Sequence, residues 1–167
     1  MSNVSMSLHT AWRGNDLMVM RQDREVDRIP ANDIRRVILA YRGHGDSPGD
    51  LAFALFELAE ETVILPAQSG IGGRVHFERQ AFWTERNCIY WVALSKVSLP
   101  RQLRPGHWLL RRDRPGHVRL AHEQLAGLID AWPLEGPQTW DQRKWQRIAR
   151  SRALAPLVHL DEARAGR

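Results

Sequence analysis

The segment LAFALFELAEETVIL, residues 51–65, decides the fold that we expect for this chain. Residues 51–58 are apolar at every position until Glu57, which is the pattern of a central strand covered on both faces. The acidic stretch AEE then makes a tight turn, and residues 62–65, TVIL, return as a second strand that ends at Pro66. Because short connections favour neighbours in space, the two strands are predicted to pair antiparallel.

The residues before this segment extend the same pattern. Residues 33–43, DIRRVILAYRG, predict a third strand with two apolar faces, interrupted by Arg36. Its two predicted faces consist of Val37, Leu39 and Tyr41 on one side and of Ile34, Ile38 and Ala40 on the other. Further upstream, the turn cluster Gly14-Asn15-Asp16 precedes an apolar run at residues 17–20. Residues 12–66 therefore predict a bent antiparallel sheet or partial barrel.

The residues after this sheet predict two more strands and two helices. CIYWVAL, residues 88–94, reads as a strand whose partner lies in HWLLRR, within a hairpin region at residues 107–120. A core-facing stripe predicts a helix near residues 121–132, and it consists of Leu125, Leu128, Ile129 and Trp132. A second helix is predicted near residues 140–153, with Trp145, Ile148 and Ala149 on its apolar side. We expect one α+β domain over residues 1–167, with a β-rich core at 12–120 and a helical part at 121–155.

Composition limits the class of protein. The chain of 167 residues is 43% hydrophobic and 26% charged, which is typical of a globular protein. No apolar run approaches the ~20 residues of a membrane span, and the N-terminal residues lack the pattern of a secretory signal. Cys88 is the only cysteine, so no disulfide can form within the chain. These features predict a cytoplasmic protein.

The order of elements over residues 33–77 resembles that of small bacterial pleckstrin-homology-like proteins. The quoted pattern is a DIRRVIL strand, a loop, DLAFALFEL, TVILP and then a glycine turn. The resemblance covers less than half of the chain and implies a bent antiparallel sheet closed by a C-terminal helix. It also implies binding of proteins, peptides or lipid head groups, and no functional residue is carried over from it.

The basic character of the chain is concentrated in its C-terminal part. Residues 1–66 hold 7 Lys and Arg against 10 Asp and Glu, whereas residues 67–167 hold 17 against 9. On the second predicted helix, Arg143, Arg147 and Arg150 fall on one side, where they could track phosphates or simply face solvent. Nucleic-acid binding by the basic C-terminal third is therefore the alternative function.

Glycine and cysteine supply no convincing catalytic motif. Three glycines at Gly70, Gly72 and Gly73 lack the lysine and hydroxyl of a phosphate-binding loop, because Arg74 and Val75 follow them. They predict a turn with positive φ. Cys88 precedes an apolar aromatic run and is predicted to be a buried structural thiol rather than a nucleophile.

The histidines offer a weak metal hypothesis. His107, His117 and His122 could converge through a hairpin, with Asp113 or Glu123 as a further ligand of a metal-dependent hydrolase. None of them shows a ligand-pair spacing. A second pair, His44 and Asp46, has the residue types of an acid/base couple but is predicted to form a turn.

The leading expectation is a non-enzymatic accessory protein that binds a protein partner. Of the seven tryptophans, Trp83 and Trp140 are the candidates for an exposed partner-binding surface, whereas Trp132 and Trp145 are expected in the core. No catalytic residue, metal ligand or cofactor is predicted.

Overall fold

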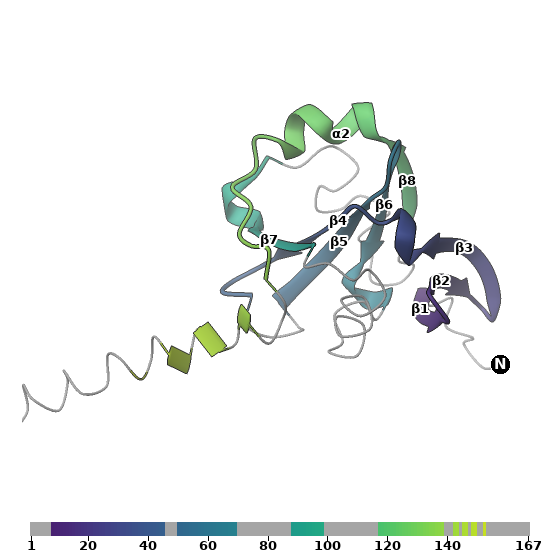
Figure 1. Cartoon of the computed structure of the whole chain (residues 1–167), viewed down its shortest axis with the longest axis horizontal. Helices are drawn as coiled ribbons and strands as arrows, with labels where there is room; N and C mark the ends of the chain where they lie inside the picture. Colours follow the sequence, from purple (N-terminus) through teal and green to yellow (C-terminus); the bar gives the residue numbers. More distant parts are fainter. Residues whose placement is uncertain are drawn as a thin grey trace, which may run out of the picture.

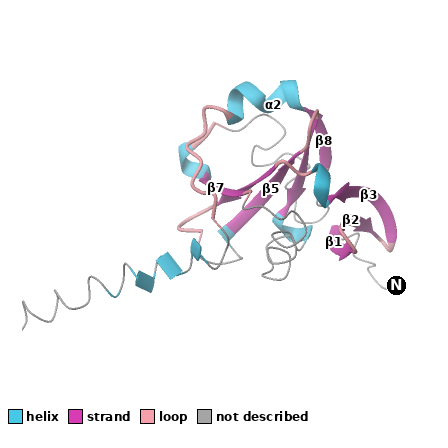
Figure 2. Cartoon of the chain, viewed as in Figure 1, coloured by secondary structure: helices cyan, strands magenta, loops and turns pink. Residues whose placement is uncertain are grey.

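A computed structural model describes residues 8–45, 50–69, 88–98 and 117–138, together with seven separate positions nearer the C-terminus. Those positions are Gln142, Arg143, Trp145, Gln146, Ile148, Ala149 and Arg152. Within these residues, a three-stranded sheet, a five-stranded sheet and a short α-helix are arranged in layers (Figures 1 and 2). The mixed α+β content predicted from the sequence is confirmed.

The smaller sheet is an antiparallel meander in the order β1-β2-β3. Its strands are β1 (Leu8–Arg13), β2 (Asp16–Arg21) and β3 (Arg24–Pro30). Gly14 takes a φ of 59° in the turn after β1, as the predicted turn requires. The turn after β2 places Gln22 and Asp23 at φ 50° and 60°, the left-handed geometry of a two-residue hairpin.

The larger sheet has the strand order β7-β4-β5-β6-β8. Its strands are β4 (Arg36–Tyr41), β5 (Leu51–Glu57), β6 (Glu61–Pro66), β7 (Ile89–Ala93) and β8 (Val118–Ala121). Strands β4, β5 and β6 are antiparallel neighbours, as predicted. Every residue of β5 is buried, which confirms that the 51–58 segment is a central strand covered on both faces.

The two polar interruptions of the apolar strands meet. Arg36 of β4 lies opposite Glu57 of β5, and its guanidinium donates two hydrogen bonds of 2.6 and 2.8 Å to the Glu57 carboxylate. Only 6% of Glu57 is exposed, so the bidentate pairing compensates for the burial of its charge.

Each face of the five-stranded sheet is covered by a different layer. Val37, Leu39 and Tyr41 share one apolar cluster with Leu17 and other buried residues of the smaller sheet. Ile38 and Ala40 face the opposite way, and their cluster contains side chains of α2 (His122–Ile129). The predicted faces of β4 are confirmed. Ile34 is the exception, because it follows the 3-10 turn Ala31–Asp33 and packs with the first cluster.

Two expectations about the sheet are wrong. The strands of residues 12–66 form two sheets instead of one bent sheet, since the 3-10 turn Ala31–Asp33 separates β3 from β4. Strand β7 pairs parallel with β4, whereas an antiparallel sheet was predicted; the predicted pairing of this strand with HWLLRR is not tested. The described residues contain no closed barrel, and residues 99–116, including HWLLRR, lie outside them. The resemblance to pleckstrin-homology-like proteins stays a prediction.

The helical part is shorter in the described residues than expected. Helix α2 ends at Ile129, before the predicted end at residue 132, and Trp132 follows in a turn in which its N–H donates to the Ile129 carbonyl. Leu125, Ile129 and Trp132 are buried, as the apolar stripe predicts. The seven separate positions have helical backbone, but a continuous helix at 140–153 lies partly outside the described residues. No helix formed by the described residues is long and apolar enough to cross a membrane.

Candidate functional site

The chain segment after α2 runs along the outer edge of β7. Trp91 and Glu135 exchange two main-chain hydrogen bonds of 2.8 and 2.7 Å, and the Gln138 N–H donates to the Ile89 carbonyl at 2.9 Å. The indole N–H of Trp91 donates to the Gln138 carbonyl at 3.0 Å. The segment 135–138 therefore occupies main-chain groups that would otherwise be open at this edge.

Gly136 makes this close approach possible. Its φ is 125°, and a Cβ at this position would lie 3.0 Å from the Ile89 carbonyl oxygen and 2.9 Å from the Gln138 nitrogen. Both atoms belong to the main chain and cannot move aside without breaking the edge pairing. A side chain at position 136 is therefore excluded on two grounds, the backbone conformation and the lack of space.

The Arg143 side chain packs against the body of the protein at the same edge. Its guanidinium donates to the Glu135 carboxylate at 2.7 Å and to the His44 carbonyl at 3.2 Å. The guanidinium carbon lies 4.7 Å from the ring centroid of Tyr41 and 4.9 Å from that of Trp91, within cation–π range of both. Only 13% of the Arg143 side chain is exposed. We call Tyr41, Trp91, Glu135 and Arg143 the arginine cluster.

Ionisation at the arginine cluster follows from burial and pairing. Burial opposes the charge of Glu135, but the hydrogen bonds from Arg143 and Tyr41 outweigh it, and the pKa of Glu135 falls below its usual 4.5. The Tyr41 hydroxyl donates a hydrogen bond of 2.7 Å to the Glu135 carboxylate. Burial and this hydrogen bond raise the pKa of Tyr41 above 10.0. At neutral pH the cluster therefore holds one carboxylate, one guanidinium and a neutral phenol.

The loop before β5 packs onto the cluster. Gly45 has a φ of 68°, and a Cβ there would lie 2.7 Å from atoms of the Tyr41 ring. The loop thus reaches the ring through a position that only glycine fits, and the preceding residue, His44, supplies the carbonyl that Arg143 binds.

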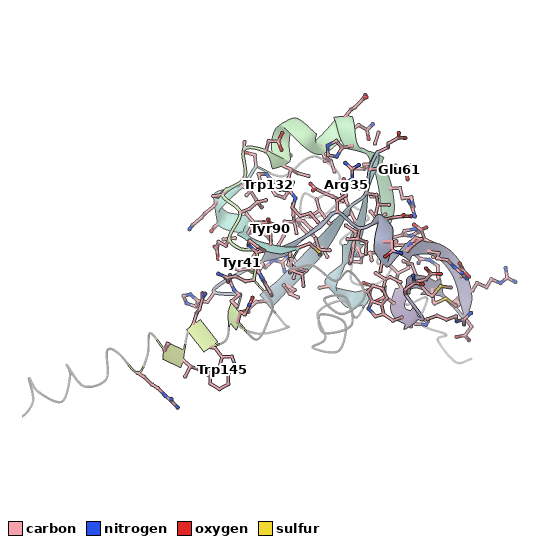
Figure 3. The ribbon with its side chains drawn as sticks, in the orientation of Figure 1. Arg35, Tyr41, Glu61, Tyr90, Trp132 and Trp145 are labelled. Atoms are coloured by element: carbon pink, nitrogen blue, oxygen red, sulfur yellow. The ribbon has the colours of Figure 1, made fainter. Side chains whose placement is uncertain are left out.

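An exposed tryptophan lies two residues beyond Arg143. Trp145 is 62% exposed, whereas Trp91 of the cluster is fully buried. Trp145 borders an open hollow of about 490 Å³, and the other lining residues are Gly136, Pro137, Gln138, Gln142 and Gln146. None of these six residues carries a charge. We call this surface the Trp145 hollow, and Figure 3 shows Trp145 well away from Arg35 and Glu61.

The core position expected for Trp145 is wrong. The i, i+3, i+4 spacing with Ile148 and Ala149 correctly describes one side of a helix, but a spacing does not say which side another element covers. In the structure it is Arg143, from the side predicted to be basic and solvated, that contacts the body of the protein. Trp145 is left at the surface.

A second hollow, of about 630 Å³, lies at the β8 side of the sheet. We call it the Arg35 hollow, and it is lined by Asn32, Asp33, Arg35, Leu58, Ala59, Glu60, Glu61 and Arg119. In contrast to the Trp145 hollow, five of its eight lining residues are charged. Figure 3 places Arg35 and Glu61 at this end of the molecule.

Arg119 joins the two sheets beside the Arg35 hollow. From β8 it donates two hydrogen bonds of 2.8 Å to Asp27 of β3 and one of 2.9 Å to Glu61 of β6. Burial opposes the charge of Asp27, but the hydrogen bonds from Arg119 and from the Arg28 main chain outweigh it and lower the pKa of Asp27 below 3.8. His117 lies 3.4 Å from the same carboxylate, and burial nevertheless lowers the pKa of His117 below 6.5.

Of the arginines and tryptophans predicted to bind a nucleic acid or a protein partner, the structure describes only Arg143. Its charge is paired with Glu135. Arg147, Arg150, Trp83 and Trp140 lie outside the described residues. The same holds for the glycine turn at residues 70–73.

The structure describes some of the histidines that were considered as metal ligands or catalytic groups, and it describes Cys88. His117 pairs with Asp27 and His122 begins α2, while His107 lies outside the described residues. No group of three potential ligands that could hold a metal ion occurs in the part of the chain that the structure describes. His44 is exposed, and its suggested partner Asp46 lies outside that part. Cys88 is buried, as predicted.

Sequence reasoning missed Glu135, Tyr41 and Trp145. Glu135 stands between two helical segments in an ordinary loop, and nothing local connects it to a tyrosine 94 positions earlier in the chain. One signal was present: Pro133 is followed within four residues by Gly136-Pro137, which indicates a chain segment of fixed shape.

Comparison with known proteins supplies no family or template. No family model, no curated protein and no solved structure matches the chain.

Proposed function

We propose that this chain is a non-enzymatic cytoplasmic binding protein and that its partner is another protein, which it contacts at the Trp145 hollow. One observation carries the proposal: a tryptophan that is 62% exposed borders a hollow lined by five further uncharged residues. Covering an exposed indole is favourable by roughly 25 cal/mol per Å² of apolar area removed from water. Tryptophan is also among the residues that contribute most at protein interfaces.

The chemistry of the lining supports a protein partner. Three of the lining residues, Gln138, Gln142 and Gln146, end in carboxamides that can both donate and accept hydrogen bonds. The Gln138 carboxamide donates to that of Gln146 at 3.3 Å, and each of the two keeps further donor and acceptor capacity. A polypeptide presents N–H donors and C=O acceptors of matching strength. Because none of the described lining residues is charged, a partner can cover them without removing an ion from water.

The arginine cluster supports the same proposal by fixing the position of the hollow. Arg143 is held by Glu135 and by two aromatic rings, and Trp145 follows two residues later. Gln138, another lining residue, is tied to β7 through Ile89 and Trp91. A surface anchored in this way loses little conformational entropy when a partner binds.

Nucleic-acid binding is the weaker alternative. It was based on three arginines acting together, and one of them, Arg143, is already neutralised by Glu135. The resemblance to pleckstrin-homology-like proteins, whose members bind proteins and peptides, also favours a protein partner, although it concerns residues 33–77 and not the Trp145 hollow.

Site-specific photo-crosslinking tests the proposal. A benzophenone amino acid replaces Trp145 in the full chain, expressed in its source cells, and a matched control carries it at Val26. Val26 is 41% exposed on β3 and is the other large apolar residue at the described surface. We expect discrete protein adducts from position 145 that are absent from position 26.

Competition makes the result specific. Excess unlabelled wild-type chain should suppress the adducts, and the Trp145→Ala chain should do so at least about tenfold less well, which corresponds to the loss of one interface hot-spot residue. Adducts that disappear on nuclease treatment would favour the nucleic-acid alternative. Equal adduct patterns from positions 145 and 26 would contradict a binding surface at Trp145.

A further inference from the structure

We propose that the Arg35 hollow is a separate binding site for a small zwitterion of the amino-acid type, which carries one carboxylate and one ammonium group. The inference does not depend on the proposed protein partner, because the two hollows share none of the lining residues named above, and Trp145 lies well away from Arg35 and Glu61 (Figure 3). It rests on the charges of the hollow and on how the main chain holds them.

The hollow contains opposite charges that do not pair with one another. Arg35, Asp33 and Glu60 all line it, and none of their charged groups has an ion-pair or hydrogen-bond partner among the described residues. Four other described arginines are paired with carboxylates. Arg28, Arg36, Arg119 and Arg143 each bind a carboxylate at 3.3 Å or less.

Main-chain hydrogen bonds hold the walls of the hollow in place. The Arg35 N–H donates to the Glu57 carbonyl at 2.8 Å, and the Leu58 N–H donates to the Glu61 carbonyl at 2.8 Å. The Glu60 carbonyl accepts from the His122 N–H at 2.7 Å, at the start of α2. The segment that carries Arg35 and the turn that carries Glu60 are therefore both fastened to the five-stranded sheet.

The remaining charged groups of the hollow are already engaged. Arg119 binds Asp27 and Glu61, so it does not compete with Arg35 for a ligand's carboxylate. Glu61 is likewise occupied by Arg119. This leaves one guanidinium and two carboxylates, those of Arg35, Asp33 and Glu60, to meet a ligand.

These three groups select for a ligand with both charges. The planar guanidinium fork of Arg35 matches a carboxylate, and carboxylate oxygens accept the N–H groups of an ammonium. A simple anion gains Arg35 but is repelled by Asp33 and Glu60, and a simple cation gains the two carboxylates but is repelled by Arg35 and leaves its guanidinium unpaired. A zwitterion satisfies both sets. The hollow is open, its volume of about 630 Å³ admits a small amino acid, and Asp33, Arg35 and Glu60 are exposed to an entering ligand.

Amide chemical shifts of the ¹⁵N-labelled full chain provide the test. L-Alanine and L-glutamine serve as zwitterionic probes, and acetate and methylammonium serve as half-ligands at the same ionic strength. We expect saturable shifts at the amides of Arg35, Ala59 and Glu60 with the amino acids, and affinity at least about tenfold weaker for either half-ligand. Shifts that never saturate, or acetate binding as tightly as the amino acids, would overturn the proposal.

Substitutions locate the site. Arg35→Gln should weaken amino-acid binding at least about tenfold, and the double variant D33N/E60Q should weaken it to a similar degree. Arg24→Gln is the matched control, because Arg24 is an exposed arginine at the start of β3 and does not line the hollow. Equal loss in the Arg24→Gln chain, or unchanged binding in the Arg35→Gln chain, would overturn the assignment. The spectra themselves show whether each variant is folded.

Discussion

At both ends of the five-stranded sheet an arginine is paired with a carboxylate, but the two neighbouring hollows differ in the charge of their lining residues. At the β7 end, Arg143 is paired with Glu135, and the described residues that line the hollow beside it are all uncharged. At the β8 end, Arg119 is paired with Asp27, and the hollow beside it contains unpaired charges of both signs. The number of arginines in a segment therefore says little about the surface it presents, since pairing decides which charges remain.

The two paired carboxylates differ in their access to water. Only 13% of the Asp27 side chain is exposed, against 38% for Glu135. If its arginine is removed, Glu135 can be hydrated where it lies, whereas Asp27 must either stay poorly hydrated or pull the two sheets apart. The β8 end should therefore depend more strongly on its arginine than the β7 end does.

Replacing Arg119 with methionine, a long apolar side chain, should give the largest effect. It removes three hydrogen bonds to carboxylates and leaves the charge of Asp27 largely buried. We expect the free energy of unfolding to fall by about 3 kcal/mol, as for other broken ion pairs with restricted access to water. Urea denaturation monitored by circular dichroism measures it.

Arg28→Met is the control for that experiment. Arg28 also binds two carboxylates, but 45% of its side chain is exposed, as is 40% of the Glu25 side chain. Its removal should change stability far less than the removal of Arg119, because water screens an exposed ion pair. A loss in the Arg119→Met chain no larger than in this control would contradict the structural role of the Arg119–Asp27 pair.

Arg143→Met should give an intermediate effect. The substitution removes the ion pair with Glu135 and the contacts with the Tyr41 and Trp91 rings. We expect a loss of about 1–2 kcal/mol, which combines a partly exposed ion pair with cation–π attraction. The same urea titration measures it. A larger loss than in the Arg119→Met chain would reverse the comparison between the two ends.

The sequence predicted the centre of the molecule because burial on both faces leaves a local signal. Residues 51–58 are apolar without alternation, and β5 is buried at every position. The faces of β4 followed from its alternation, and Arg36 and Glu57, the two breaks in the pattern, lie opposite each other. In each case the side chains themselves carry the information.

The sheet boundaries could not be predicted in the same way. A strand with the composition of β7 can pair parallel or antiparallel, and the direction depends on the path of the intervening chain. The separation of β3 from β4 occurs at Ala31–Asp33, a three-residue turn with no distinctive sequence. The Trp145 hollow depends on contacts between residues far apart in the chain, such as Tyr41 with Glu135, for which a single sequence carries no signal.

The smallest predicted effect concerns pH, and the two ends should lose stability in opposite directions. Burial lowers the pKa of His117 below 6.5, so as the pH falls through 6.5 the unfolded chain takes up a proton before the folded chain does. That proton uptake destabilises the β8 end on the acid side. Burial and the hydrogen bond to Glu135 raise the pKa of Tyr41 above 10.0, so above pH 10 the unfolded chain loses a proton first. The β7 end is then destabilised on the alkaline side.

Two conservative substitutions separate these contributions. Unfolding free energies of the wild-type, His117→Gln and Tyr41→Phe chains are measured by urea denaturation from pH 5 to 11. His117→Gln should flatten the profile between pH 6.5 and 5 and leave the alkaline limb unchanged, because glutamine does not titrate. Tyr41→Phe should do the reverse above pH 10, apart from a constant loss for the missing hydrogen bond to Glu135. If the acid limb keeps its slope in the His117→Gln chain, then His117 is not the group that titrates there. The β8 end would then owe its pH response to another group, because the Asp27 carboxylate, with its pKa below 3.8, is ionised throughout this range.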